Sequence, residues 1–145
     1  MAPTTASVSI SSSDLTPGSN LSINASSTIM KTGLTTGLEF VDMGKGTLTV
    51  AHTHKALFEG QAASVDGDQA CFVYLCNLAT DDTYYMEVGI HDTVIGRLYA
   101  GDWMFVPYSQ GDADAELFIE AEGGTCDYEY AIFRSSNVLV DSSKA

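Results

Sequence analysis

Basic residues are scarce in this chain of 145 residues. It has six Lys and Arg against nineteen Asp and Glu, which gives a net charge of −13. Nucleic acids and anionic membranes are bound through cationic side chains, so this balance argues against both as partners. The acidic surface keeps the protein soluble and would complement a basic partner.

Cysteine is also rare, and long apolar runs are missing. The three cysteines are an odd number, and Cys71 and Cys76 fall on opposite faces of one predicted strand, roughly 17 Å apart. A disulfide needs Cα atoms within about 7 Å, so we expect reduced thiols and assembly in a cytosol. No run of about 18 apolar residues predicts a membrane span, and the first residues lack the pattern of a signal peptide.

The stretch from Cys71 to Phe133 consists of short apolar or alternating runs. They are five to eight residues long, as β-strands usually are. Turn-forming pairs and clusters separate them, at Asp81-Asp82, His91-Asp92, Gly101-Asp102, 111–114 and Gly123-Gly124. This punctuation predicts an all-β fold, an antiparallel β-sandwich or a jelly-roll-like barrel.

Alternation within the runs predicts which side chains face the core. One face takes Tyr84, Met86, Val88 and Ile90, then Ala115, Leu117, Ile119 and Ala121, then Cys126, Tyr128, Tyr130 and Ile132. Acidic residues dominate the opposite face, with Phe118 as the exception. The runs 71–78 and 103–108 are apolar on both faces, which predicts central strands or strands covered by a partner.

The first 20 residues are rich in Ser and Thr. A segment this polar cannot order itself, so we expect either a flexible leader or an extended arm that binds a neighbouring subunit. The arm is favoured by sparse apolar anchors at Val8, Ile10, Leu15, Leu21 and Ile23. The predicted organisation is an N-terminal arm over residues 1–20 and a β-sandwich domain over residues 21–145. Residues 55–63 are the one candidate for a helical turn.

His52 and His54 form the sharpest local signal for chemistry. Two histidines at i and i+2 on a strand share a face and could bind one metal ion. With Gly46 and Glu59 they reproduce the spacing of the first cupin motif, and the segment from Gly101 to Pro107 is similar to the start of the second. There Asp112 stands where the third histidine ligand belongs. The preferred interpretation is no metal site; a cupin-like site with His52, His54 and Glu59 is the alternative.

Other chemistry finds less support in the sequence. The spacing of Asp112, Asp114 and Glu116 is that of the first ligands of a calcium loop, but the required later Gly and Glu are missing. The cysteines lie in apolar runs without a basic neighbour, and no nucleophile elbow is present. We therefore expect no catalytic residues and no cofactor. Trp103, among other aromatic residues, could bind a sugar, although such residues more often pack a core or an interface.

Several short motifs follow one another between residues 72 and 133. They are Asn77-Leu78, Tyr85-Met86-Glu87-Val88-Gly89, Gly96-Arg97-Leu98, Ala100-Gly101-Asp102, Phe105-Val106-Pro107, 117–121 and 129–133. In this order and spacing the segment resembles small virion structural proteins of tailed bacteriophages. The turn Glu122-Gly123-Gly124-Thr125 departs from that pattern, and the N-terminal half shows no likeness.

The resemblance implies a non-enzymatic virion protein, a decoration or cement protein on the capsid. Its partners would be the major capsid protein or other virion proteins, and its own copies in a homo-oligomer such as a trimer. It would be assembled in the host cytoplasm and located in the virion. The predicted partner interface comprises Val8, Ile10, Leu15, Leu21, Ile23 and Trp103. The alternatives are a cupin-like metal-binding enzyme or module and a sugar-binding virion module.

Overall fold

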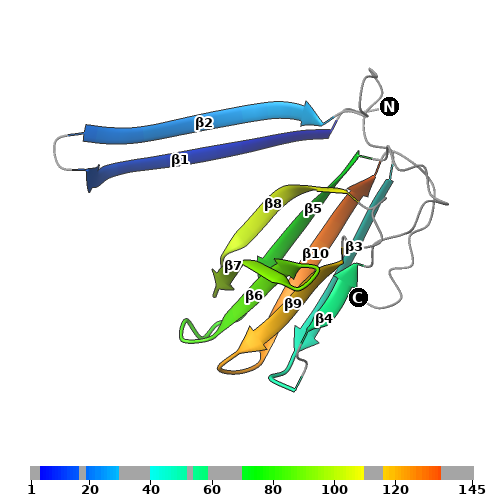
Figure 1. Ribbon diagram of the computed structural model, residues 1–145. Helices are drawn as coiled ribbons and strands as arrows, with labels where there is room; N and C mark the ends of the chain where they lie inside the picture. The colour runs from blue at the N-terminus through cyan, green and yellow to red at the C-terminus, as the bar shows by residue number, and fades with distance from the viewer. Residues whose placement is uncertain are drawn as a thin grey trace. The chain divides into compact units, whose positions relative to one another are not determined.

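The computed structural model describes residues 4–16, 19–29, 40–51, 54–58, 70–109 and 116–134. Every regular element in these ranges is a β-strand, and all pairs are antiparallel. The chain divides into two compact units, Met1–Leu38 and Glu39–Ala145. The predicted all-β class is confirmed (Figure 1).

The first unit contains one long hairpin. Its strands are β1 (Thr4–Thr16) and β2 (Ser19–Ile29), paired so that Ile10 lies opposite Ile23 and Val8 opposite Ala25. The domain boundary expected at residue 20 falls inside β2. The reason is visible in the sequence, since alternation of apolar and Ser or Asn residues continues through residues 21–26.

The second unit is made of two four-stranded sheets. Sheet I has the order β3-β10-β5-β8, with β3 (Phe40–Leu48), β10 (Cys126–Arg134), β5 (Ala70–Asn77) and β8 (Trp103–Ser109). Sheet II has the order β4-β9-β6-β7, with β4 (Lys55–Phe58), β9 (Leu117–Glu122), β6 (Tyr85–Ile90) and β7 (Thr93–Tyr99). Both sheets are open, so the arrangement is a β-sandwich and not a closed barrel (Figure 1).

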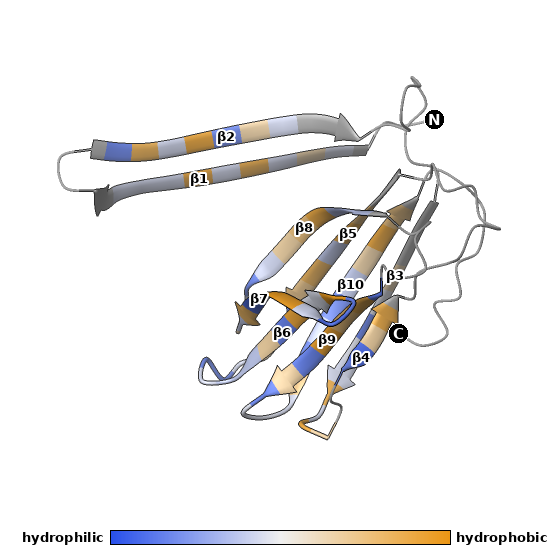
Figure 2. Ribbon diagram, in the orientation of Figure 1, coloured by the Kyte–Doolittle hydropathy of each residue, from blue (hydrophilic) through white to orange (hydrophobic). Residues whose placement is uncertain are grey.

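The core lies between the inner faces of the two sheets. Sheet I contributes Leu48, Val73, Leu75, Tyr108, Cys126, Tyr128 and Ile132, and sheet II contributes Leu57, Met86, Val88, Leu98, Leu117, Ile119 and Ala121. These residues follow the period of two read from the sequence. Strand β9, LFIEAE, begins with three apolar residues and alternates after them, and Figure 2 shows both hydrophobic and hydrophilic segments along it. Burial of this apolar surface is the main force that holds the sheets together.

Asn77 is the buried polar residue at the end of β5. Its side chain is fully buried and donates from Nδ2 to the Leu98 carbonyl at 2.8 Å, while its Oδ1 accepts from the Ala79 N–H at 2.9 Å. Its backbone N–H and C=O pair with Asp102 and Gly101. One residue of sheet I thus fixes the end of β7 in sheet II and the turn that leads into β8.

The helical turn expected over residues 55–63 is wrong where the structure describes it. Lys55–Phe58 is strand β4, and Lys55 and Ala56 pair with Ile119 and Phe118 of β9. The pattern of the short run is ambiguous, and pairing with the exposed edge of β9 decides for the strand. Residues 59–63 lie outside the described ranges.

Candidate functional site

The outer face of sheet I is unusually apolar. Because Val73, Leu75 and Asn77 of β5 point into the core, the alternate residues Phe72, Tyr74 and Cys76 point outward. The register continues this face onto the neighbouring strands. Its members, which we call the outer aromatic face, are Phe72, Tyr74, Cys76, Trp103, Phe105, Pro107, Ala131 and Phe133.

Aromatic rings pack on one another across this face. Phe72 stacks on Phe105 with ring centroids 5.3 Å apart, and Phe105 meets Phe133 edge-on at 6.1 Å. Trp103, at the start of β8, leaves 52% of its surface exposed. Outer faces of antiparallel sheets are usually polar, so the rings gathered here form an apolar patch of a kind that is uncommon on such a face.

Strand β8 adds a main-chain edge to the same face. It stands at the end of the sheet order and pairs only with β5 among the described strands. The sequence of β8, WMFVPYS, contains no charged residue, although charges are a usual protection of edge strands, and Pro107 is the one protective residue in it. The sequence predicted central or covered strands for 71–78 and 103–108: β5 is central, and β8 is an edge.

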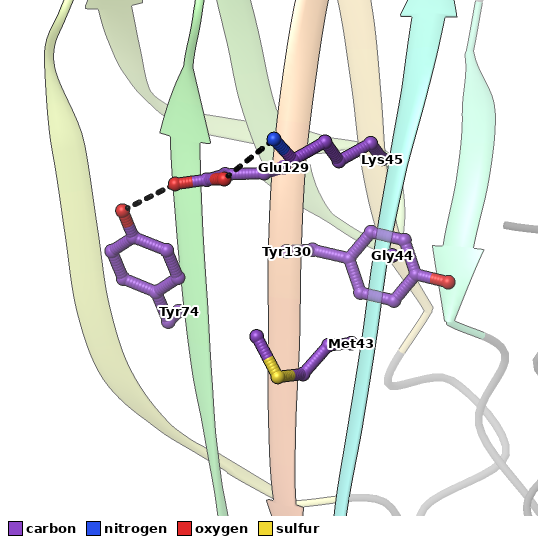
Figure 3. A pocket seen from close by; sticks show the side chains of 6 residues that line it. All are labelled: Met43, Gly44, Lys45, Tyr74, Glu129 and Tyr130. Atoms are coloured by element: carbon purple, nitrogen blue, oxygen red, sulfur yellow. Dashed lines mark hydrogen bonds and ion pairs between the residues drawn. The ribbon is translucent and has the colours of Figure 1, made fainter.

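A shallow hollow of about 200 Å³ lies on β3, β10 and β5 beside the aromatic residues. Figure 3 shows Glu129 between Tyr74 and Lys45: the Tyr74 hydroxyl donates to its carboxylate at 3.1 Å, and the Lys45 Nζ lies 3.8 Å from the other oxygen. Desolvation raises the pKa of Tyr74, and the contacts with Cys76 and Glu129 raise it further. Tyr74 therefore serves as a hydrogen-bond donor at any physiological pH.

The hairpin carries most of the other predicted interface residues. Val8, Ile10, Leu21 and Ile23 all lie on one face, because Val8 and Ile10 are two apart on β1 and their row continues through Ile23 and Leu21 of β2. The opposite face carries Ser7, Ser9, Ser11, Ser22, Asn24 and Ser26. Leu15 is in β1, but its side chain lies outside what the structure describes.

A polar row crosses the outer face of sheet II. The His54 ring stacks on Phe118 at 4.1 Å, and its Nε2 contacts Glu116 at 2.5 Å. The His54 Nδ1 lies 3.8 Å from Glu120. Further along, Arg97 contacts Glu87 at 3.1 Å and lies over the Tyr85 ring at 4.6 Å. These pairs lie at the surface, where solvent screens the charges, so they add little to stability.

The position of His54 bears on the cupin hypothesis, in which this residue is a metal ligand. His54 belongs to the outer face of an open sheet and is held by two glutamates and a phenylalanine. A cupin ligand points instead into the interior of a barrel. His52 and Glu59 lie outside the described residues, and so does Asp112. Glu87, Glu120 and Glu122 place carboxylate oxygens within 4.8 Å of one another, but Glu87 is already paired with Arg97 and Glu120 lies beside His54.

No family model, curated protein or solved structure matches the chain. None of the described residues forms a helix long and apolar enough to cross a membrane.

Sequence reasoning named Trp103 and the hairpin anchors as interface residues, which stays a prediction, and it missed the aromatic contacts of Phe72, Phe105 and Phe133. The signal was present, since the runs around these residues are apolar on both faces. What the sequence could not supply was the register that brings the three rings together across β5, β8 and β10. The pairing of Glu87 with Arg97 depends on register in the same way.

The cysteines give a prediction about reactivity. Cys76 and Cys126 are free and buried, and burial raises the pKa of the Cys126 thiol. In a Cys71→Ser variant, which keeps only these two thiols, we expect labelling by a thiol reagent at pH 8 to be far slower in the native protein than in denaturant. Stoichiometric labelling of the native protein at the denatured rate would contradict the burial.

Proposed function

We propose that the chain is a non-enzymatic structural protein of a tailed-phage virion, a decoration protein that binds the capsid shell. The observation that carries the proposal is the outer aromatic face with its uncharged edge strand β8. The likeness of residues 72–133 to small virion proteins supports it from the sequence. The partner is the major capsid protein or a neighbouring virion protein.

The aromatic face suits adhesion for physical reasons. Aromatic side chains give large contact area with few rotatable bonds, and they are enriched among the residues that dominate binding energy. The free edge of β8 can add a strand of the partner through main-chain hydrogen bonds over the residues before Pro107, which itself has no N–H to donate. Weak individual contacts suffice, because many copies on a lattice, linked to one another, multiply the affinity.

Acidic residues beside the outer aromatic face would also contribute to binding of the shell. Asp127 and Glu129 border the aromatic face on β10, and Lys45 is the cation beside them. A shell surface with exposed basic residues would meet this border favourably, and the charge would speed the first encounter at low salt. Binding is therefore expected to weaken as ionic strength rises, while the aromatic contacts persist.

Co-sedimentation with capsid shells tests the proposal. The shells are assembled from the major capsid protein of the phage that the proposal implies, and the bound fraction is measured at increasing chain concentration. We expect saturable binding, weakened at least about tenfold by Trp103→Ala. Ile95→Ala is the matched control, because Ile95 is 53% exposed on β7 of sheet II and should leave binding unchanged.

Two results would overturn the proposal. One is the absence of saturable binding to shells by folded wild-type chain. The other is equal binding by the Trp103→Ala and wild-type chains, which would remove the aromatic face from the contact. Soluble glycan binding that is lost in the same variant would favour the sugar-binding alternative.

A further inference from the structure

The N-terminal hairpin has an apolar face that is largely exposed to solvent. Its apolar row, which we call the hairpin stripe, consists of Val8, Ile10, Leu21, Ile23 and Ala25. The cross-strand pair at its centre is Ile10 and Ile23, which are 49% and 47% exposed. On β1 the stripe side is the better covered, with Val8 half-buried between the exposed Ser7 and Ser9.

A two-stranded hairpin of this kind requires a second layer on its apolar face to be stable. An isolated two-stranded hairpin is marginally stable at best in water, and it becomes stable when a further layer covers its apolar face. β1 and β2 are thirteen and eleven residues long, longer than most strands in globular proteins. The polar face, with Ser9 bonded to Asn24 at 2.9 Å, gives no hydrophobic stabilisation.

The distribution of charged residues along the chain indicates which molecule can cover the hairpin stripe. Of the 25 acidic and basic residues, only Asp14 and Lys31 belong to residues 1–38, so the net charge of −13 resides entirely in residues 39–145. Two copies of the chain repel each other through their sandwiches. The neutral hairpin is the part of the chain where copies can meet without that cost.

The hairpin also lacks the usual protection against self-association. Natural edge strands carry lysines, inward-pointing charges or prolines that prevent pairing with another copy. The sequences of β1 and β2 contain one charged residue, Asp14, which is near the end of β1, and no proline. The hairpin is thus long and nearly free of charge, so neither its edges nor its stripe carry the charges that would oppose contact with a second copy.

We propose that the hairpin stripe is a self-association surface whose occupant is the hairpin stripe of a second copy of this chain. Ile10 and Ile23 lie at the centre of the contact, with the Ser-rich faces turned to solvent. Sheets that pack face to face in this way lie about 10 Å apart with interdigitating side chains. The inference concerns the first unit and does not depend on the proposed virion function.

Sedimentation equilibrium of the full-length chain at several concentrations tests the inference. We expect the wild type to be an oligomer at micromolar concentration and the Ile10→Asp/Ile23→Asp variant to be a monomer. The matched control is Ser11→Asp/Ser22→Asp, which adds the same two charges to a directly opposed, exposed pair on the polar face. The control should associate like the wild type, with at most a few-fold change in the dissociation constant.

Urea unfolding, followed through Trp103 in the sandwich, shows whether each variant keeps a folded second unit. A monomeric wild type, or an Ile10→Asp/Ile23→Asp variant that still associates, would overturn the inference. So would dissociation of the Ser11→Asp/Ser22→Asp control. If Trp103→Ala dissociates the oligomer while the isoleucine variant does not, the contact is the outer aromatic face and the stripe is not the surface.

Discussion

Replacing Asn77 by Leu is expected to lower the free energy of unfolding of the sandwich by about 3 kcal/mol. The change removes the side-chain hydrogen bonds to the Leu98 carbonyl and to the half-buried Ala79 N–H, and it leaves an apolar side chain against both groups. Because Leu98 belongs to β7 and Ala79 to the segment before β6, the connection between the two sheets loosens at one end. Urea unfolding monitored by Trp103, the single tryptophan, measures the loss.

Asn77→Asp separates hydrogen bonding from packing at the same site. The acid keeps the acceptor for Ala79, but when ionised it offers no donor to Leu98 and places a charge at a fully buried position. Burial raises the pKa of such a carboxyl in the folded state above its unfolded value of about 3.9. The variant therefore binds protons more tightly when folded, so its deficit relative to wild type grows as pH rises above about 4.

Below that pH the acid is neutral in both states and can donate, so the deficit should shrink to that of a modest packing change. Asn24→Asp is the control, because Asn24 is exposed on the hairpin and should not alter unfolding of the sandwich. An Asn77→Leu variant as stable as wild type would show that Asn77 does not hold the sheets together.

Gly89→Ala is expected to destabilise the sandwich by about 2–3 kcal/mol through overpacking. A methyl group at Gly89 would lie 2.5 Å from the Thr93 carbonyl oxygen and even closer to the Phe118 ring. The carbonyl belongs to the backbone and cannot turn away, so the strands themselves must move. Thermal unfolding measures the loss.

Gly96→Ala is the matched control in the neighbouring strand, where the added methyl meets nothing within 4 Å. We expect no loss there. Combining Gly89→Ala with Phe118→Leu should recover part of the stability, since the ring is one of the two obstacles. Equal stability of the Gly89→Ala and Gly96→Ala variants would contradict the packing described for Phe118.

Phe118 shows how far sequence reasoning reached. Alternation correctly assigned Leu117, Ile119 and Ala121 to the core, and it left Phe118 as an apolar residue on the acidic face. The structure explains the exception: the ring fills the space that Gly89 leaves on β6, and His54 covers it. Both contacts join segments far apart in the chain, so periodicity within one strand could not reveal them.

The same limit applies to the architecture. Each strand's inner and outer faces follow from its own residues, and so does the all-β class. The order of strands in sheets I and II depends on which edges meet, as with β4 beside β9 and β8 at the end of sheet I. Alternation through residues 21–26 already indicates a strand there, whereas its pairing with β1 required the register.

The candidate interface residues also fall into two groups: those that the sequence pattern alone indicated and those that only the strand register brings together. Val8, Ile10, Leu21 and Ile23 were selected as isolated anchors, and the hairpin register unites them in one stripe. The aromatic face was visible only as two runs without a polar side, because three different strands supply Phe72, Phe105 and Phe133. Local pattern thus identifies apolar residues outside the core, whereas long-range pairing assembles them into continuous surfaces.

Fluorescence of Trp103 during titration with capsid shells tests the central claim most directly, because this single tryptophan lies half-exposed on the outer aromatic face. If the face binds the shell, the emission should shift to shorter wavelength and quenching by acrylamide should fall in step with the bound fraction. Saturated binding with unchanged emission and unchanged quenching would contradict it, since the shell would then be held by another surface.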